Sequence, residues 1–495
     1  MKIDTKLLEK VFLLFLAVLF FYYLFLASNT AFLGEDESAY YYEGQLFSQS
    51  QYPAFFVPKS PNVLPMFVPL FYASLFSVFG SSLALAKMIS TLFGFLTIIL
   101  VYLIGKKINF YVGIFASGIL LSMVLFTHYM LIAYVDVPIA FFSILFTYVA
   151  LKMDSVKKAI FTGVLLALSF YAKESGFFML IVLIAYAVFL CIREKNIKYL
   201  KLSLLAAIVS LIIFSPNLIR NIYYYNYPYS LLFDIFFSNP SSSSISASFL
   251  QQLSTIFDFA GAFGWLALIL VILGSIYIIL NPERFKQISI LISVFILLLF
   301  ALVYSLGYFS GKIILSDPRY LLILFPQIAL VGGYFMWALK EKNKYFLLIL
   351  IPIFLFGVYS SVLTANSTAS STRFPSNYID ALKWIGTKTP KDSIIFTAYG
   401  GSVRYFADRG IIWSSIKEFP QLMTTQNSTY IYDVLKKNNV SYILIWNGII
   451  SQDYMISGSN IAGVFTYNFL NTVAGDTKHF NTTYQNADDI IFKLL

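Results

Sequence analysis

Charged residues, histidine and cysteine are scarce in this chain. Asp, Glu, Lys and Arg make up 12% of its 495 residues, whereas a soluble domain holds about 25%. Cys191 is the only cysteine, which excludes a disulfide within the chain and a cysteine-ligated zinc site. The two histidines, His128 and His479, are far apart in the sequence. There is no P-loop, Gly-x-Gly-x-x-Gly or His-Glu-x-x-His motif, which argues against a nucleotide-driven pump and a membrane zinc protease.

Apolar residues are abundant instead, at 59% of the chain, and they form long runs. A run of roughly 17–25 apolar residues can cross a bilayer as a helix. The sequence therefore predicts a polytopic α-helical membrane domain over residues 1–366, and its first helix is retained because no signal-peptide cleavage pattern follows it. Eleven spans are expected, at residues 11–33, 82–104, 111–129, 134–151, 159–172, 176–192, 202–219, 260–280, 288–308, 320–338 and 345–363. Segment 65–79 is too short to span and is expected to form a juxtamembrane helix.

The basic residues indicate which side of the membrane each loop faces. Lys and Arg gather in alternate loops, as the positive-inside rule predicts for cytoplasmic loops. These loops are 106–107, 152–158, 193–201, 283–286 and 340–344. The N-terminus is therefore expected in the cytoplasm, and the first long loop, residues 34–81, outside the plasma membrane. The net charge of +10 then reflects membrane topology rather than binding to nucleic acid.

Hydropathy drops from about residue 367. Short helices are expected at 378–385 and 430–437, and buried strands at 393–397 and 441–446. This alternation is typical of a small α/β domain, so residues 367–495 are expected to form an extracytoplasmic α/β domain that guides the acceptor or partner proteins. Sequons in or just before this domain make four asparagines candidates for N-glycosylation. They are Asn366, Asn427, Asn439 and Asn481.

Three consecutive carboxylates, Glu35, Asp36 and Glu37, follow the first apolar run. Carboxylates are costly at membrane depth, so a cluster at a helix end usually faces a water-filled cavity or a ligand. Several tyrosines, Glu43 and Lys59 follow in the same loop. Carboxylates can act as general bases, and a fixed lysine can bind phosphate as a point charge. The alternative is a solvated acidic loop beside an interfacial tyrosine belt.

Five short motifs, in this order along the chain, resemble those of the GT-C fold glycosyltransferases that use polyprenyl-phosphate sugars. They are Asp36-Glu37-Ser38-Ala39-Tyr40, Lys59-Ser60-Pro61, Asp136-Val137-Pro138, Lys173-Glu174-Ser175-Gly176 and Arg319-Tyr320 with Pro326. The nearest families are the protein O-mannosyltransferases and the aminoarabinose transferases that modify lipid A. Ser60 replaces the first proline of the family's Lys-Pro-Pro segment. The resemblance covers roughly residues 1–340.

The resemblance implies an inverting glycosyltransferase that takes a sugar from a dolichyl or undecaprenyl phosphate. It makes Asp36 the base that deprotonates the acceptor hydroxyl of a protein, glycan or lipid. It makes Glu37 a supporting residue. The lipid phosphate leaves already ionised, so it needs electrostatic stabilisation more than a proton. The candidate phosphate ligands are Lys59, Arg319, Lys173 and Arg220, and the candidate sugar or acceptor ligands are Asp136, Tyr40, Glu43 and His128.

Structural roles stay open for several of these residues. Glu37 could form a salt bridge with a neighbouring cation, and Asp136 could cap a helix. Lys87 and Arg220 are expected to reach lipid headgroups. Asp36, Glu37 and Asp136 could also bind Mg²⁺ or Mn²⁺ through oxygen, although activity is expected to survive metal chelation.

Two other functions compete with sugar transfer to a hydroxyl. An oligosaccharyltransferase-like enzyme would move a lipid-linked glycan to asparagine, but that class usually carries a Trp-Trp-Asp type motif, and the five tryptophans here are isolated. A transporter or flippase for lipid-linked sugars would use similar helices and aromatic residues. A transporter should place ionisable residues near the membrane midplane, whereas here they cluster at one face.

Overall fold

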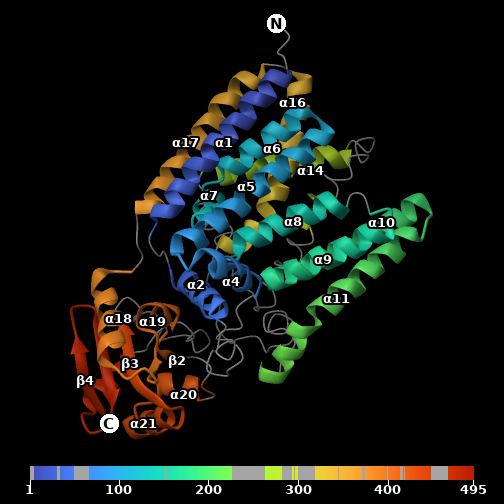
Figure 1. Cartoon of the computed structure of the whole chain (residues 1–495). Coiled ribbons are helices and arrows are strands. Elements are labelled where there is room, and N and C mark those ends of the chain that lie inside the picture. Colours follow the sequence, from blue (N-terminus) through green and yellow to red (C-terminus); the bar gives the residue numbers. More distant parts are fainter. Residues whose placement is uncertain are drawn as a thin grey trace.

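The computed structural model is mostly helical. It describes residues 5–30, 34–49, 66–150, 153–225, 262–280, 293–294, 296–298, 318–343, 345–370, 374–398, 400–412, 416, 418–446 and 467–495. Helices from the first 370 residues form an elongated bundle with the N-terminus at one end (Figure 1). A smaller region that contains a β-sheet and the C-terminus lies at the opposite end (Figure 1).

Six helices in the described part of the chain are long and apolar enough to cross a membrane, or seven if a bent pair counts as one span. The six are α1 (Thr5–Asn29), α5 (Leu83–Ile108), α10 (Phe177–Glu194), α11 (Lys198–Tyr225), α16 (Phe325–Lys342) and α17 (Phe346–Ser370). Further apolar helices are α4 (Phe67–Phe79), α8 (Asp136–Ala150), α9 (Val156–Ala172) and α14 (Ala262–Leu280). The predicted polytopic α-helical membrane protein is confirmed.

Two of the expected spans differ from regular helices. The span expected at 111–129 is divided into α6 (Phe110–Ser122) and α7 (Val124–Met130), which meet at 73°. Met123 has an extended backbone at this bend, and no Gly or Pro at that position signals it. The span expected at 320–338 begins as a 3-10 helix, η3 (Pro318–Leu324), before α16. Most of the span expected at 288–308 lies outside the described residues.

Small residues allow the central helices to pack closely, as is common between helices in membranes. A Cβ atom added to Gly105 of α5 would lie 2.7 Å from the Cα of Gly113 on α6. A Cβ atom added to Gly333 of α16 would lie 2.6 Å from the backbone nitrogen of Ala116, also on α6. Helix α6 is therefore held between α5 and α16.

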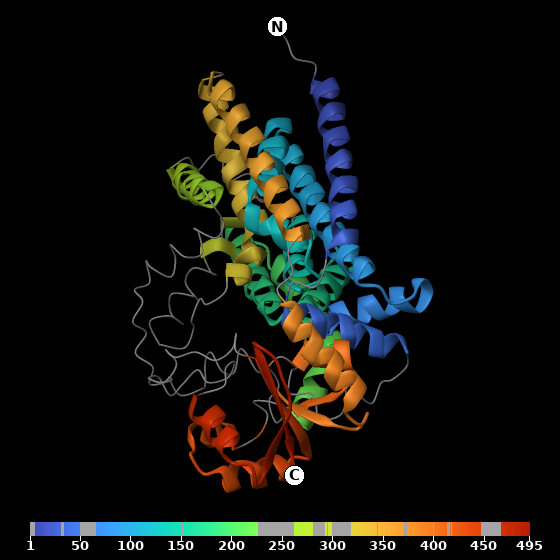
Figure 2. The same cartoon turned by 90° about the vertical axis from the view of Figure 1, so that its left-hand side faces the viewer.

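The acidic segment after α1 is a helix, α2 (Glu35–Ser48), rather than the loop expected from the sequence. Its first three carboxylates occupy the first turn, where negative charge interacts favourably with the helix dipole. Helix α2 packs on α4, and a Cβ atom added to Gly44 would lie 2.7 Å from the Cβ of Tyr72. These two helices lie between the membrane helices and the sheet (Figures 1 and 2).

A buried ion pair fixes the start of α2 to the bundle. The Lys87 ammonium on α5 lies 3.2 Å from the Glu37 carboxylate, and both side chains are 0% exposed. The backbone N–H of Ala133 donates a hydrogen bond to the same carboxylate oxygen at 2.7 Å. The prediction that Lys87 reaches lipid headgroups is therefore wrong, because Glu37 supplies a partner inside the protein.

The C-terminal region contains a five-stranded sheet with strand order β2-β1-β3-β5-β4. Its strands are β1 (Ile394–Phe396), β2 (Gly410–Ile412), β3 (Val440–Trp446), β4 (Phe480–Gln485) and β5 (Asp489–Leu494). β1 is parallel to β2 and β3, whereas β5 is antiparallel to β3 and β4. The helices of this region are α18 (Ser376–Lys388), α19 (Gly400–Ala407), α20 (Phe419–Thr424), α21 (Ser428–Lys437) and α22 (Tyr467–Gly475). The predicted α/β character is confirmed.

The Lys87–Glu37 pair makes a prediction about stability. Lys87→Ala leaves a buried carboxylate without its cation, and breaking such a pair costs about 3–5 kcal/mol. We expect a clearly lower thermal midpoint for the purified full chain, and recovery of most of that loss in the double variant Lys87→Met with Glu37→Gln.

Lys106→Ala is the matched control for this experiment. Lys106 lies on the same helix and pairs with Glu9, but both side chains are partly exposed, so the midpoint should change little. A Lys87→Ala midpoint as high as that of Lys106→Ala would contradict the structural role of the buried pair.

Candidate active site

An ion pair between α2 and the start of α16 forms the centre of the candidate site. Asp36 Oδ2 accepts a hydrogen bond from Arg319 Nη1 at 2.5 Å. Arg319 lies in η3, directly before α16. The Asp36 side chain is 43% exposed and that of Arg319 is 18% exposed. The pair therefore combines a solvent-accessible carboxylate with a cation that could bind an anion.

Tyr134 packs beside this pair. The guanidinium carbon of Arg319 lies 5.1 Å from the centre of the Tyr134 ring, which is the geometry of a cation–π contact. The Tyr40 ring lies 6.5 Å from that of Tyr134. Neutral aromatic rings thus form one wall beside Asp36 and Arg319.

A second ion pair joins α8 to α9. Asp136 is the first residue of α8, and Lys173 follows the last residue of α9. Their side chains form an ion pair in which Asp136 is 2% exposed and Lys173 is 12% exposed. Residues 131–135, which lead into α8, are buried and are held by Glu37 through Ala133. The second pair is therefore linked through the chain to the start of α2.

Two other predicted ligands connect segments that are distant in sequence. Glu43 Oε1 accepts a hydrogen bond from Arg404 Nη1 of α19 at 2.7 Å, and the Glu43 side chain is 3% exposed. His128 Nδ1 and Thr368 Oγ1 are hydrogen-bonded at 2.7 Å, which joins α7 to α17. Both predicted sugar or acceptor ligands thus form contacts within the protein.

Some of the predicted site residues are not described at the level of side chains. Lys59 lies outside the described residues, and Arg220 lies on α11 without a described side chain. Within the described ranges, no group of three His, Cys, Asp or Glu side chains could hold a metal ion. The three carboxylates considered as metal ligands each pair with a different cation instead. The pairs are Asp36–Arg319, Glu37–Lys87 and Asp136–Lys173.

An apolar groove of about 460 Å³ lies between α4, α9 and α11. It is lined by Met66, Phe67, Leu70, Phe71, Ser74, Leu168, Tyr171, Pro216 and Asn217. Tyr171 lies two residues before Lys173. The groove therefore extends along α9 toward the end that carries the Asp136–Lys173 pair.

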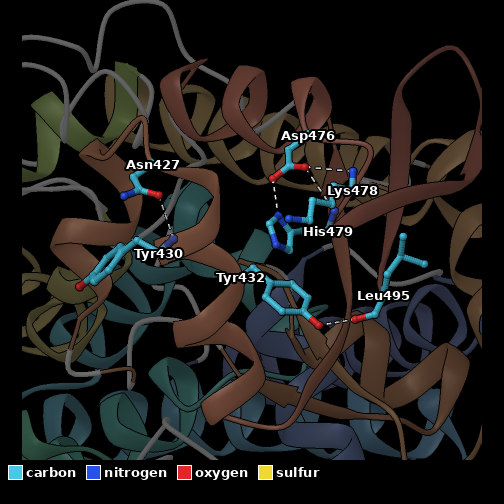
Figure 3. A network of polar contacts seen from close by, with 7 residues as sticks. All are labelled: Asn427, Tyr430, Tyr432, Asp476, Lys478, His479 and Leu495. Carbon is cyan, nitrogen blue, oxygen red and sulfur yellow. Dashed lines mark hydrogen bonds and ion pairs between the residues drawn. The ribbon is translucent and has the colours of Figure 1, made fainter.

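The sequon asparagines lie in four different backbone settings, and all four are exposed. Asn366 is inside helix α17. Asn427 precedes α21, where its Oδ1 accepts a hydrogen bond from the N–H of Tyr430 at 3.1 Å (Figure 3). Asn439 has a left-handed backbone with φ 56°, and Asn481 lies on the edge strand β4. Their modification stays a prediction.

Sequence reasoning missed three residues of this arrangement. Tyr134 stands two positions before the Asp136 motif, so its place in the sequence was an available signal. A single lysine inside an apolar helix requires a partner, which was the signal at Lys87. Arg404 follows its partner Glu43 by 361 positions, and no local pattern relates the two.

Comparison with family models gives a match over part of the chain. Residues 63–219, about a third of the chain, match the family model described as dolichyl-phosphate-mannose-protein mannosyltransferase. No curated protein sequence matches the chain significantly.

Solved structures match over most of the chain. ArnT from Cupriavidus metallidurans bound to undecaprenyl phosphate is 11% identical over 97% of both chains, with a TM-score of 0.65. The archaeal oligosaccharyltransferase AglB from Archaeoglobus fulgidus, in complex with an inhibitory peptide and a dolichol-phosphate, is 11% identical over 88% of this chain and 70% of that chain, with a TM-score of 0.59.

The Archaeoglobus fulgidus oligosaccharyltransferase in complex with Zn and sulfate is 14% identical and also has a TM-score of 0.59. The match covers 84% of this chain but only 64% of that enzyme. At such identities the likeness establishes the fold. The chain has the GT-C fold of membrane glycosyltransferases.

Proposed function

We propose that this protein is an integral-membrane, inverting glycosyltransferase that moves a hexose or pentose from a polyprenyl phosphate to a protein, glycan or lipid. The observation that carries this proposal is the contact between accessible Asp36 and Arg319, because it puts a base and an anion-binding cation together. The family-model match to dolichyl-phosphate-mannose-protein mannosyltransferases supports a lipid-linked sugar donor. The likeness to ArnT bound to undecaprenyl phosphate supports the same donor class.

In the proposed reaction, Asp36 removes the proton of the acceptor hydroxyl as its oxygen attacks the anomeric carbon. The bond between that carbon and the phosphate oxygen breaks on the opposite side, so the configuration inverts. The electron pair stays with the departing polyprenyl phosphate, which Arg319 and Lys173 stabilise by charge. Protonated Asp36 then returns its proton to water.

Arg319 changes partner in this reaction. In the structure its guanidinium bonds the Asp36 carboxylate and so occupies a group that the acceptor hydroxyl needs. The phosphodiester of the donor offers the guanidinium an alternative anionic acceptor with a matching geometry, and its negative charge increases as the sugar leaves. Binding of the donor would thereby release Asp36 for the acceptor hydroxyl.

The distribution of basic residues supports an extracytoplasmic site. Lys106, at the end of α5, pairs with Glu9 near the N-terminus. Lys340, at the end of α16, lies 3.7 Å from the centre of the Tyr111 ring at the start of α6. These lysines gather at the N-terminal end of the bundle, which we place in the cytoplasm. The site and the C-terminal region would then face the outside of the plasma membrane.

The apolar groove between α4, α9 and α11 suits the lipid part of the donor. Its walls are mostly apolar and aromatic side chains, which match a polyprenyl chain. It extends along α9 toward Lys173, so a chain in the groove could present its phosphate to that lysine. Lys59 and Arg220 remain proposed additional phosphate ligands.

Asp36→Asn tests the proposed base. An amide cannot accept the proton, and loss of a general base typically lowers the rate about 10²–10⁴-fold. The measurement is sugar transfer from polyprenyl-phospho-sugars by the purified full chain in liposomes. Asp154→Asn is the control, because Asp154 belongs to an exposed pair with Lys158 and should keep full activity. Full transfer by Asp36→Asn would exclude Asp36 as the base.

Substitutions of the cations test recognition of the phosphate. Arg319→Lys removes the planar fork, Lys173→Gln removes a charge, and Lys59→Ala removes both charge and stem. A hydrogen bond to a charged group contributes about 1.5–3 kcal/mol, so each KM for the donor should rise on the order of tenfold or more.

The control for these variants is Lys158→Gln, which changes an exposed lysine and should leave the KM for the donor unchanged. Thermal midpoints would show that each variant is folded. Unchanged donor affinity in all three variants would contradict the phosphate assignment.

A further inference from the structure

Helix α2 is held from the C-terminal region as well as from the membrane helices. Three consecutive residues in the middle of α2 contact three residues in and just after α19. The Glu43–Arg404 hydrogen bond is 2.7 Å long, the Tyr42 hydroxyl donates to Asp408 Oδ1 at 2.9 Å, and the rings of Tyr41 and Tyr405 are 5.1 Å apart. Polar and aromatic contacts therefore join the two helices.

The Glu43–Arg404 pair is buried enough to hold these helices in place. The Glu43 side chain is 3% exposed and that of Arg404 is 14% exposed. Water screens a buried pair much less than a surface pair, and removing one partner leaves the other charge buried. The pair is therefore more than an incidental surface contact.

Helix α19 is itself fixed to its own region. The Arg409 side chain, 6% exposed, donates hydrogen bonds to the backbone oxygens of Ala407, Gly386 and Thr389. It also donates one to the Thr389 hydroxyl at 2.9 Å. These bonds connect the end of α19 to α18. Arg404 thus extends from a rigid support.

Asp36 lies seven residues before Glu43 on the same helix, a separation of about 10.5 Å along its axis. Glu37 anchors the first turn to Lys87 of the membrane bundle, while Glu43 anchors the second part to the C-terminal region. A rotation or tilt of α2 at Glu43 would therefore also move Asp36. A displacement of about 1 Å at a reacting group can cost about 10²-fold in rate.

We propose that Arg404 is a positioning residue for Asp36, so that the C-terminal α/β region is part of the catalytic machinery and not only an acceptor guide. This inference rests on the proposed function, because it takes Asp36 as the base. Arg404 acts through Glu43 and α2, without contact with the substrate.

The test compares Arg404→Ala, Arg404→Lys and Glu43→Gln with the unchanged full chain. Hydrogen exchange of the α2 amides is measured without substrate, and kcat and KM are measured with a polyprenyl-phospho-sugar. Arg404→Ala should raise exchange in α2 at least tenfold and lower kcat about 10–100-fold, with KM for the donor within about twofold. Glu43→Gln should act in the same direction, and Arg404→Lys should restore part of both losses.

Lys383→Ala is the matched control within the C-terminal region. Lys383 lies on α18 in an exposed ion pair with Asp380 and should change neither quantity. Unchanged α2 exchange in Arg404→Ala would overturn the proposal. So would an unchanged kcat with a raised KM for the acceptor, because that pattern indicates a region that only binds the acceptor.

The two readouts separate this inference from the proposed function. If the unchanged chain transfers no sugar from any polyprenyl-phospho-sugar supplied, the proposed function fails. Hydrogen exchange still shows in that case whether Arg404 holds α2. If the unchanged chain is active and α2 exchange does not respond to Arg404→Ala, the positioning role fails while the proposed function stands.

Discussion

A carboxylate at the edge of a bilayer needs a cation as its partner. Three carboxylates of helix α2 form ion pairs with cations from three separate parts of the chain. Glu37 pairs with Lys87 of α5, Asp36 with Arg319 before α16, and Glu43 with Arg404 of α19. Membrane helices from both halves of the bundle and the C-terminal region therefore converge on one short helix. The position of α2, and of everything it carries, depends on these ion pairs.

The three pairs differ in exposure, and this difference suggests different roles. Glu37 and Glu43 are 0% and 3% exposed, whereas Asp36 is 43% exposed. A buried carboxylate that is satisfied by a cation can fix a helix but has little access to a substrate. An exposed carboxylate whose cation can exchange for a phosphate can take up a proton. We propose that α2 thus carries its anchoring carboxylates and its catalytic carboxylate at different positions along one helix.

Much of the fold could be predicted from the sequence, because membrane spans and the α/β alternation leave strong periodic patterns. Helix α2 could not, since its tyrosines and carboxylates give no apolar stripe and its stability comes from partners such as Arg404. The motif residues Asp36, Asp136, Lys173 and Arg319 do form ion pairs at one end of the bundle. Which cation each carboxylate binds required the tertiary structure, because Lys87 and Arg404 are remote in sequence from their partners.

The most direct measurement of the central claim is a cryo-electron microscopy structure of the chain in lipid nanodiscs with a bound polyprenyl-phospho-sugar. We expect Arg319 to contact the donor phosphate and to have left Asp36, and the Asp36 carboxylate to face the anomeric carbon from the side opposite the phosphate. The Glu37–Lys87 and Glu43–Arg404 pairs should be unchanged. A donor phosphate bound away from Arg319, with the Asp36–Arg319 pair intact, would contradict the account.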